Sequence, residues 1–209
     1  MKSNTLNSFS FLVLSGIGQL VEAQFKSSDI VILFDESGSM GEEQDYAAAA
    51  AVKLFEEFDA VTQSKPRFAV GGFRSGLAQS AQGVREITPD FVESSIALKT
   101  ALEALVTSGG REQGYEALYD VFTEGDAAQD PIDWRFREAT SICVLVFTDE
   151  ESSGARIAED FIDVRGSNAI IPIVNGGGTA YSAVSTLTNN WILSLDAFTN
   201  DPSTFIPEI

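Results

Sequence analysis

The sequence predicts a single α/β domain built around a mostly parallel, doubly wound β-sheet. Short apolar runs alternate with longer segments that carry apolar residues at helical spacing. The runs at 29–34 and 142–147 are continuously apolar, as in central strands covered on both faces. Strands separated by helices imply right-handed crossovers and helices on both faces of the sheet. A chain of 209 residues suffices for one such domain.

The expected elements follow one another with short connections. Pro89 and Asp90 are taken to open the second helical segment, and residues 123–137, rich in turn-forming residues, are taken as a loop. The expected strands are 29–34, 67–74, a short edge strand at 84–87, 142–147, 169–174 and 191–195. The expected helices are 44–61, 89–105, 114–122, 156–164, a short helix ending at 187 and a terminal helix from 196.

The charge balance and the absence of histidine exclude several classes of function. Thirty-one acidic against thirteen basic residues give a formal net charge of −18, which opposes binding to nucleic acid and to anionic membrane surfaces. Without histidine, catalytic triads that use an imidazole base and zinc sites that use imidazole ligands are excluded. A metal site in this chain must therefore be built from oxygen ligands, which suit Mg²⁺, Ca²⁺ or Mn²⁺.

The N-terminal residues have the pattern of an export signal. Lys2 supplies a positive charge, residues 9–21 are mostly apolar, and Val21 and Ala23 occupy the −3 and −1 positions of a cleavage site. Residues 1–23 are therefore predicted to be a signal peptide and residues 24–209 the mature domain. The alternative is an uncleaved anchor or a buried first helix. The lone cysteine, Cys143, permits no intramolecular disulfide and is expected to be buried.

Hard oxygen donors follow two of the strongest predicted strands. The first strand continues into Asp35, Ser37 and Ser39, and the strand at 142–147 ends in Thr148 and Asp149. Because ligands of open α/β sheets bind at the carboxyl ends of the strands, these side chains are expected to converge on one cation. The alternative is that Asp35, Ser39 and Asp149 only cap the helices that follow them.

A resemblance to a known family supports the metal interpretation. Residues 29–40 resemble the D-x-S-x-S metal-ion-dependent adhesion site of von Willebrand factor type A domains, and residues 147–149 are similar to that family's third metal loop. The second loop of the family usually supplies a threonine. Here residues 111–118 are similar instead to the integrin β-subunit version of the domain, which places Glu112 at the ligand position.

The resemblance extends from residue 29 to about residue 195 and carries several implications. It implies a Rossmann-like, doubly wound six-stranded sheet with one antiparallel edge strand, and a metal at the top of that sheet. It also implies that an acidic residue of a partner completes the coordination. The metal ligands predicted from the residues and the resemblance together are Asp35, Ser37, Ser39, Glu112 and Asp149.

The same comparison raises an adjacent calcium site. The integrin β loop continues to a pair of aspartates, and this chain has Glu42 and Glu43 at that spacing. The alternative is that these two acids are stabilised only by the dipole of the helix that begins there.

The function predicted from these observations is secreted, divalent-metal-dependent adhesion. The cofactor is expected to be Mg²⁺, or else Ca²⁺ or Mn²⁺, and the partner an extracellular protein with an exposed acidic residue. No nucleic-acid partner, no stable membrane insertion after signal cleavage and no catalytic residue are expected. The alternative is a structural or self-assembling extracellular matrix component in which the metal only stiffens the loops.

Overall fold

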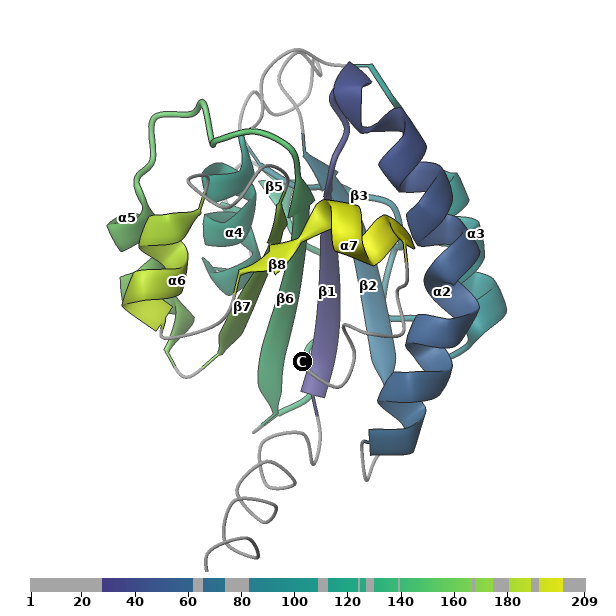
Figure 1. Ribbon diagram of the computed structural model, residues 1–209. Helices are drawn as coiled ribbons and strands as arrows, with labels where there is room; N and C mark the ends of the chain where they lie inside the picture. The colour runs from purple at the N-terminus through teal and green to yellow at the C-terminus, as the bar shows by residue number, and fades with distance from the viewer. Residues whose placement is uncertain are drawn as a thin grey trace, which may run out of the picture.

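The described residues form one six-stranded sheet in the order β3-β2-β1-β6-β7-β8 (Figure 1). The computed structural model describes residues 28–61, 66–73, 83–108, 113–123, 125–126, 130–138, 140–166, 168–174, 181–188 and 192–200. The strands are β1 (Ser28–Asp35), β2 (Arg67–Phe73), β3 (Arg85–Glu86), β6 (Ser141–Thr148), β7 (Ala169–Val174) and β8 (Leu193–Ser194). All neighbouring pairs are parallel except β2 with β3 at one edge. The predicted fold class is confirmed, including its antiparallel edge strand.

Helices cover both faces of this sheet. They are α2 (Gly41–Val61), α3 (Ser95–Glu103), α4 (Gly114–Thr123), α5 (Ala158–Arg165), α6 (Ser182–Thr188) and α7 (Leu195–Asn200). The helices α2, α3 and α7 share one hydrophobic cluster with the sheet, and α4, α5 and α6 share the other. In Figure 1, α7 crosses in front of the strands.

The central strand β1 shows why two cores form. Its side chains alternate, so that Ile30, Ile32 and Phe34 join the cluster under α2, α3 and α7. Val31 and Leu33 point the other way, into the cluster under α4, α5 and α6. All five are buried, because β1 lies between β2 and β6 and is covered on both faces. A continuously apolar run is what such a position requires.

The carboxyl ends of the neighbouring central strands β1 and β6 lie side by side. Both strands run upward in Figure 1, and β1 continues there into α2. Phe34 is paired with Phe147, and their rings stack with centroids 4.9 Å apart, which fixes the two strand ends relative to each other. The loop after β1 therefore meets the loop after β6.

The helix predicted to open at Pro89 begins later than expected. The residues around Pro89 and Asp90 form bends, and Val92 instead pairs with Phe68 of β2 through hydrogen bonds of 2.9 and 2.7 Å. The helix α3 begins at Ser95, where the Ser94 side chain accepts a hydrogen bond from the Ala97 amide. The expectation of a helix opening at Pro89 was wrong because an N-cap serine and pairing with β2 set the boundary.

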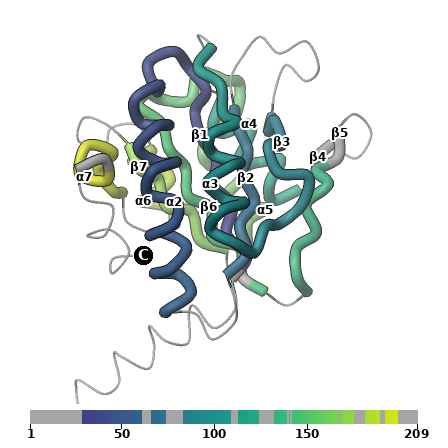
Figure 2. The backbone as a smooth tube through the Cα atoms, turned by 90° about the vertical axis from the view of Figure 1, so that its right-hand side faces the viewer, coloured from purple at the N-terminus to yellow at the C-terminus, as the bar shows by residue number. Residues whose placement is uncertain are grey.

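The segment expected to be a loop at 123–137 contains a small strand pair. Its strands β4 (Gly125–Asp126) and β5 (Asp130–Pro131) pair antiparallel and lie at the periphery of the molecule in Figure 2. Trp134, which follows them, is buried and donates from Nε1 to the Thr88 carbonyl at 2.7 Å. The segment is thereby fastened to the edge of the sheet.

The N-terminal residues 1–27 lie outside the described part of the chain, so the predicted signal peptide stays a prediction. Across the described ranges, no helix combines the length and the apolar character needed to cross a membrane.

Candidate metal centre

The last residues of the central strands β1 and β6 are joined directly at the carboxyl end of the sheet. Asp35 ends β1, Thr148 ends β6, and Thr148 Oγ1 donates to Asp35 Oδ2 at 2.8 Å. Both residues are fully buried. Two of the loops that carry predicted metal ligands therefore meet at a buried carboxylate.

The loop after β1 folds back on that carboxylate. Asp35 Oδ1 accepts the amide of Ser37 at 2.8 Å, which turns the chain sharply after the strand. A short 3-10 helix, Gly38–Met40, follows, and its buried Met40 anchors the turn in the core. The hydroxyl oxygens of Ser37 and Ser39 lie 2.9 Å apart. Three of the predicted ligands thus lie in one tight loop, with Ser39 on the solvent side.

The Asp35 carboxyl is in an unfavourable environment for a negative charge. Burial raises the pKa of Asp35 from 3.8 to about 6, although hydrogen bonds from Ser37 and Thr148 lower it. The charge of Asp149 contributes to raising it further. Asp149 therefore lies close enough to Asp35 for the two carboxylates to repel each other.

Asp149 supplies the observation that best tests whether a cation fits here. Its Oδ1 atom is buried and has no hydrogen-bond partner among the described residues. A buried carboxylate oxygen without a donor is costly, and a hard cation is the partner that satisfies it. Two carboxylates and two hydroxyls are the oxygen donors that Mg²⁺, Ca²⁺ and Mn²⁺ accept. The donor set fits a hard divalent cation.

The structure brings together four of the five predicted ligands: Asp35, Ser37, Ser39 and Asp149. Glu112 lies outside the described residues, and its role remains a prediction. Within the described ranges, no group of three or more carboxylate, thiol or imidazole side chains could hold a metal. This agrees with a site in which two of the four described donors are hydroxyl groups.

The two acids predicted for an adjacent site lie in the first turn of α2. Glu42 is exposed, whereas Glu43 is half-buried and its Oε2 atom is buried without a hydrogen-bond partner in the described part of the chain. The N-terminal dipole of α2 favours both carboxylates. The adjacent site therefore stays a prediction.

Sequence reasoning missed a side chain that holds the loop from behind. Gln44 is buried in the first turns of α2, and its Nε2 atom donates to the Asp35 carbonyl at 3.1 Å and to the Val106 carbonyl at 3.2 Å. It thus joins the loop after β1 to the segment after α3. A polar residue near a helix start gives no signal of such a role, because one of its two partners, Val106, lies 62 positions away in the sequence.

Comparison with protein-family models and with curated protein sequences gives no match. Comparison with solved structures does. Proximal thread matrix protein 1 from the mussel byssus superposes with a TM-score of 0.62 at 20% identity, over 87% of this chain and 46% of that one. A second structure of that mussel protein, described as having a zinc-occupied metal-ion-dependent adhesion site motif, gives a TM-score of 0.58 at 18% identity, over 86% and 47%.

A further solved structure has the same fold. The von Willebrand factor type A protein from Catenulispora acidiphila superposes with a TM-score of 0.55 at 16% identity, over 86% of this chain and 42% of that one. The superposed part covers less than half the length of each of these three solved chains. The sheet order, the antiparallel edge strand and these superpositions together show that the chain has the fold of a von Willebrand factor type A domain.

Proposed function

We propose that the protein is a secreted adhesion or matrix module that binds a divalent cation and, through it, an acidic group of an extracellular protein partner. The observation that carries the proposal is the pair of carboxylates at the ends of β1 and β6. Asp35 is buried with a pKa raised to about 6, and Asp149 has a buried oxygen without a donor among the described residues. Such a pair is stabilised by a cation.

Five residues are proposed to hold the cation: Asp35, Ser37, Ser39, Glu112 and Asp149. When bound, the cation supplies a positive charge and a coordination position for a carboxylate of the partner. The protein's own residues orient the donors: Thr148 fixes one oxygen of Asp35, and the amide of Ser37 fixes the other. Mg²⁺ is the proposed ion, with Ca²⁺ and Mn²⁺ as alternatives. Binding without catalysis is proposed, because the chain has no histidine for a Ser-His or Cys-His pair that would activate a nucleophile.

The experiment is a comparison of the mature domain, residues 24–209, with its Asp35→Ala variant. Mg²⁺ or Ca²⁺ is expected to raise the unfolding temperature of the unchanged protein and to release or absorb heat in a calorimetric titration. At a cation concentration one hundred times Kd, the stabilisation is about 2.7 kcal/mol. Asp35→Ala should lose both effects because the central ligand is gone.

The matched control is Asp45→Ala, which removes an exposed carboxylate from α2 and the same unit of charge. This variant should keep the full cation effect. If the unchanged protein shows neither a thermal shift nor a binding heat with any of the three cations, the proposed function is wrong.

The similarity to a thread matrix protein favours a second candidate function, a self-assembling matrix component in which the cation stiffens the loops. Sedimentation velocity separates the two candidates. A module that captures a partner stays monomeric when Mg²⁺ or Ca²⁺ is added, whereas a self-assembling component oligomerises.

A further inference from the structure

Glu36 lies between two proposed metal ligands, yet its side chain points away from solvent. It is fully buried, which is rare for a glutamate unless its charge is paired. The Arg85 side chain of the edge strand β3 supplies the pairing. Its Nε atom donates to Glu36 Oε2 at 2.8 Å, and its terminal nitrogen contacts Oε1. The first metal loop is thereby tied to the edge of the sheet.

The same carboxylate also holds the segment that follows α3. The amide of Val106 donates to Glu36 Oε1 at 2.9 Å, and the amide of Ser108 donates to the Glu36 carbonyl at 3.0 Å. Gln44 adds a third connection, since its side-chain amide bonds both the Asp35 carbonyl and the Val106 carbonyl. Residues 106–108 and residues 35–36 are therefore fastened to each other along their length.

The backbone of β2 fixes where the Glu36 side chain lies. The Glu36 amide donates to the Phe73 carbonyl at 3.0 Å, at the end of β2. A Cβ atom on Gly72 would overlap the Glu36 carboxyl group. Glycine at position 72 therefore leaves the room in which the Glu36 carboxylate lies against β2.

From these contacts we infer that Glu36 is a positioning residue of the metal centre. Its side chain holds the loop of Asp35 and Ser37 against residues 106–108 and strand β3. The inference rests on the proposed cation site. Glu36 is not a proposed ligand. Its charge is paired with Arg85, so its effect on the cation comes from the placement of its neighbours and not from added negative charge.

Removing such a positioning side chain typically weakens metal binding by about tenfold to a hundredfold. We expect Glu36→Gln to raise the Kd for Mg²⁺ or Ca²⁺ by this factor. Backbone amide hydrogen exchange at Val106 and Ser108 should also become faster in the metal-free variant. The glutamine side chain cannot form the ion pair with Arg85, so it holds residues 106–108 less firmly. Gly72→Ala should give the same two changes, since it displaces the Glu36 carboxylate without removing any charge.

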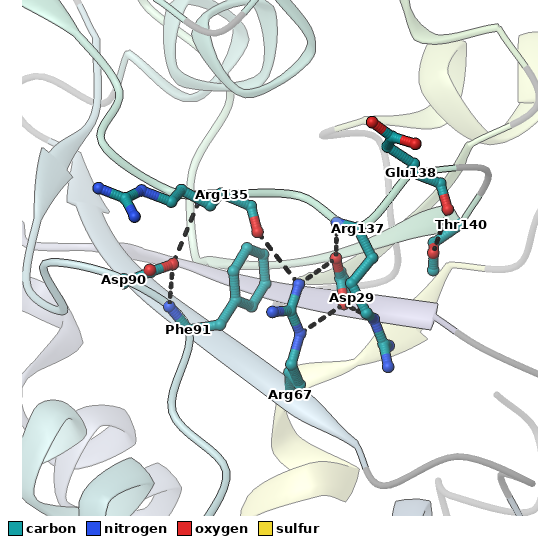
Figure 3. Close-up of polar contacts among 8 residues, drawn as sticks. All are labelled: Asp29, Arg67, Asp90, Phe91, Arg135, Arg137, Glu138 and Thr140. Carbon is teal, nitrogen blue, oxygen red and sulfur yellow. Dashed lines mark hydrogen bonds and ion pairs between the residues drawn. The ribbon is translucent and has the colours of Figure 1, made fainter.

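The matched control is Asp29→Asn. Asp29 lies at the opposite end of β1 and is also a fully buried carboxylate held by arginines, as Figure 3 shows. Arg67 donates to it at 3.0 and 2.7 Å, and Arg137 donates with its backbone amide and its side chain at 2.7 Å each. Asp29→Asn is therefore expected to lower the free energy of unfolding while leaving the Kd of the cation within about twofold of the unchanged protein, because the lost ion pair is remote from the metal.

The measurements are the cation Kd by calorimetry, the free energy of unfolding in a chelator and amide exchange by mass spectrometry. The positioning role is overturned if Glu36→Gln and Gly72→Ala change the Kd no more than Asp29→Asn does. If Glu36→Gln does not fold, Gly72→Ala alone decides between these outcomes. If the unchanged protein binds no divalent cation, the proposed function fails and the positioning role fails with it. If the unchanged protein binds the cation and the variants have the same Kd, only the positioning role is overturned.

Discussion

Asp35 combines full burial, two hydrogen bonds and a nearby carboxylate in one side chain. Its ionised form is disfavoured in the metal-free protein, chiefly because burial removes it from water. The hydrogen bonds from Ser37 and Thr148 recover only part of that cost. A residue in this position is stable either when it is protonated or when a cation lies beside it.

A pH dependence of stability follows from the raised pKa. The native pKa of Asp35 is about 6 against 3.8 in the unfolded chain, so the folded state holds the proton more tightly. The stability that this group contributes is therefore fully present below about pH 4 and is lost as the pH rises through 6. A difference of about two pH units corresponds to on the order of 3 kcal/mol.

The measurement is urea unfolding in a chelator at pH 4.5 and pH 7, for the unchanged protein and for Asp35→Asn. The unchanged protein should lose stability relative to Asp35→Asn between these two pH values, because asparagine does not titrate. Saturating Mg²⁺ should remove the loss. An equal difference between the two proteins at both pH values contradicts the prediction.

The oxygen donors in the loop after β1 could be predicted from the sequence. The contacts that hold this loop in place could not. Asp35, Ser37 and Ser39 are local: their spacing in one short loop is enough to bring their oxygens together. The partners of Glu36 lie 49 and 70 positions away, and these pairs depend on how far each strand and loop reaches at the edge of the sheet. Spacing within a sequence contains no such information.

At the scale of elements, α4 and the loop between β6 and α5 are joined by another buried carboxylate. Glu116 of α4 is buried, and its Oε1 atom accepts the amides of Ala155 at 2.7 Å and Arg156 at 3.1 Å. Gly154 lies so close that a Cβ atom there would overlap the Glu116 carboxyl group. This loop begins at Asp149, so Glu116 fixes the far end of the segment that carries a proposed ligand.

Glu116→Ala is expected to release this loop from α4. Two amides in a partly buried loop lose their acceptor, which costs about 1–3 kcal/mol of unfolding free energy. Amide exchange at Ala155 and Arg156 should become faster. Glu116→Gln should lose less stability, because its side-chain oxygen can still accept. The control is Glu159→Ala, which removes an exposed acid from α5 and should change neither quantity. Equal stability of Glu116→Ala and the control contradicts the prediction.

The type of an element could be predicted where its hydrophobic pattern is strong. The boundaries of an element could not be predicted where contacts between distant segments determine them. The apolar strands β1 and β6 follow from continuous hydrophobic runs. The start of α3 depends on Ser94 and on the pairing of Val92 with Phe68, a contact between distant segments that overrides the local signal of Pro89. The strands β4 and β5 have two residues each, too short for any periodicity.

At the scale of the whole molecule, stability comes from two hydrophobic cores and is opposed by charge. The sheet has a separate cluster on each face, and Cys143 lies buried in one of them, with its pKa raised to about 12 by burial. The chain has no second cysteine, so no intramolecular disulfide contributes. Against these cores stands a net charge of −18, whose self-repulsion disfavours the compact state.

Monovalent salt is therefore expected to stabilise the domain independently of the metal site. Raising NaCl from about 0.01 to 0.15 M shortens the Debye length from about 30 to about 8 Å, which screens repulsion between acids spread over the surface. The unfolding temperature should rise by about 2–4 °C for each kcal/mol gained. Asp35→Ala should show the same gain from NaCl, because a distributed charge does not depend on one site.

The measurement is a thermal melt at increasing NaCl in a chelator, followed by melts with Mg²⁺ at fixed ionic strength. The two series separate screening from specific binding: the NaCl gain should be shared by the unchanged protein and Asp35→Ala, and the Mg²⁺ gain should be confined to the unchanged protein. A fall in unfolding temperature with NaCl contradicts the prediction. It would mean that attractive pairs such as Asp29 with Arg67 outweigh the net repulsion among the acids.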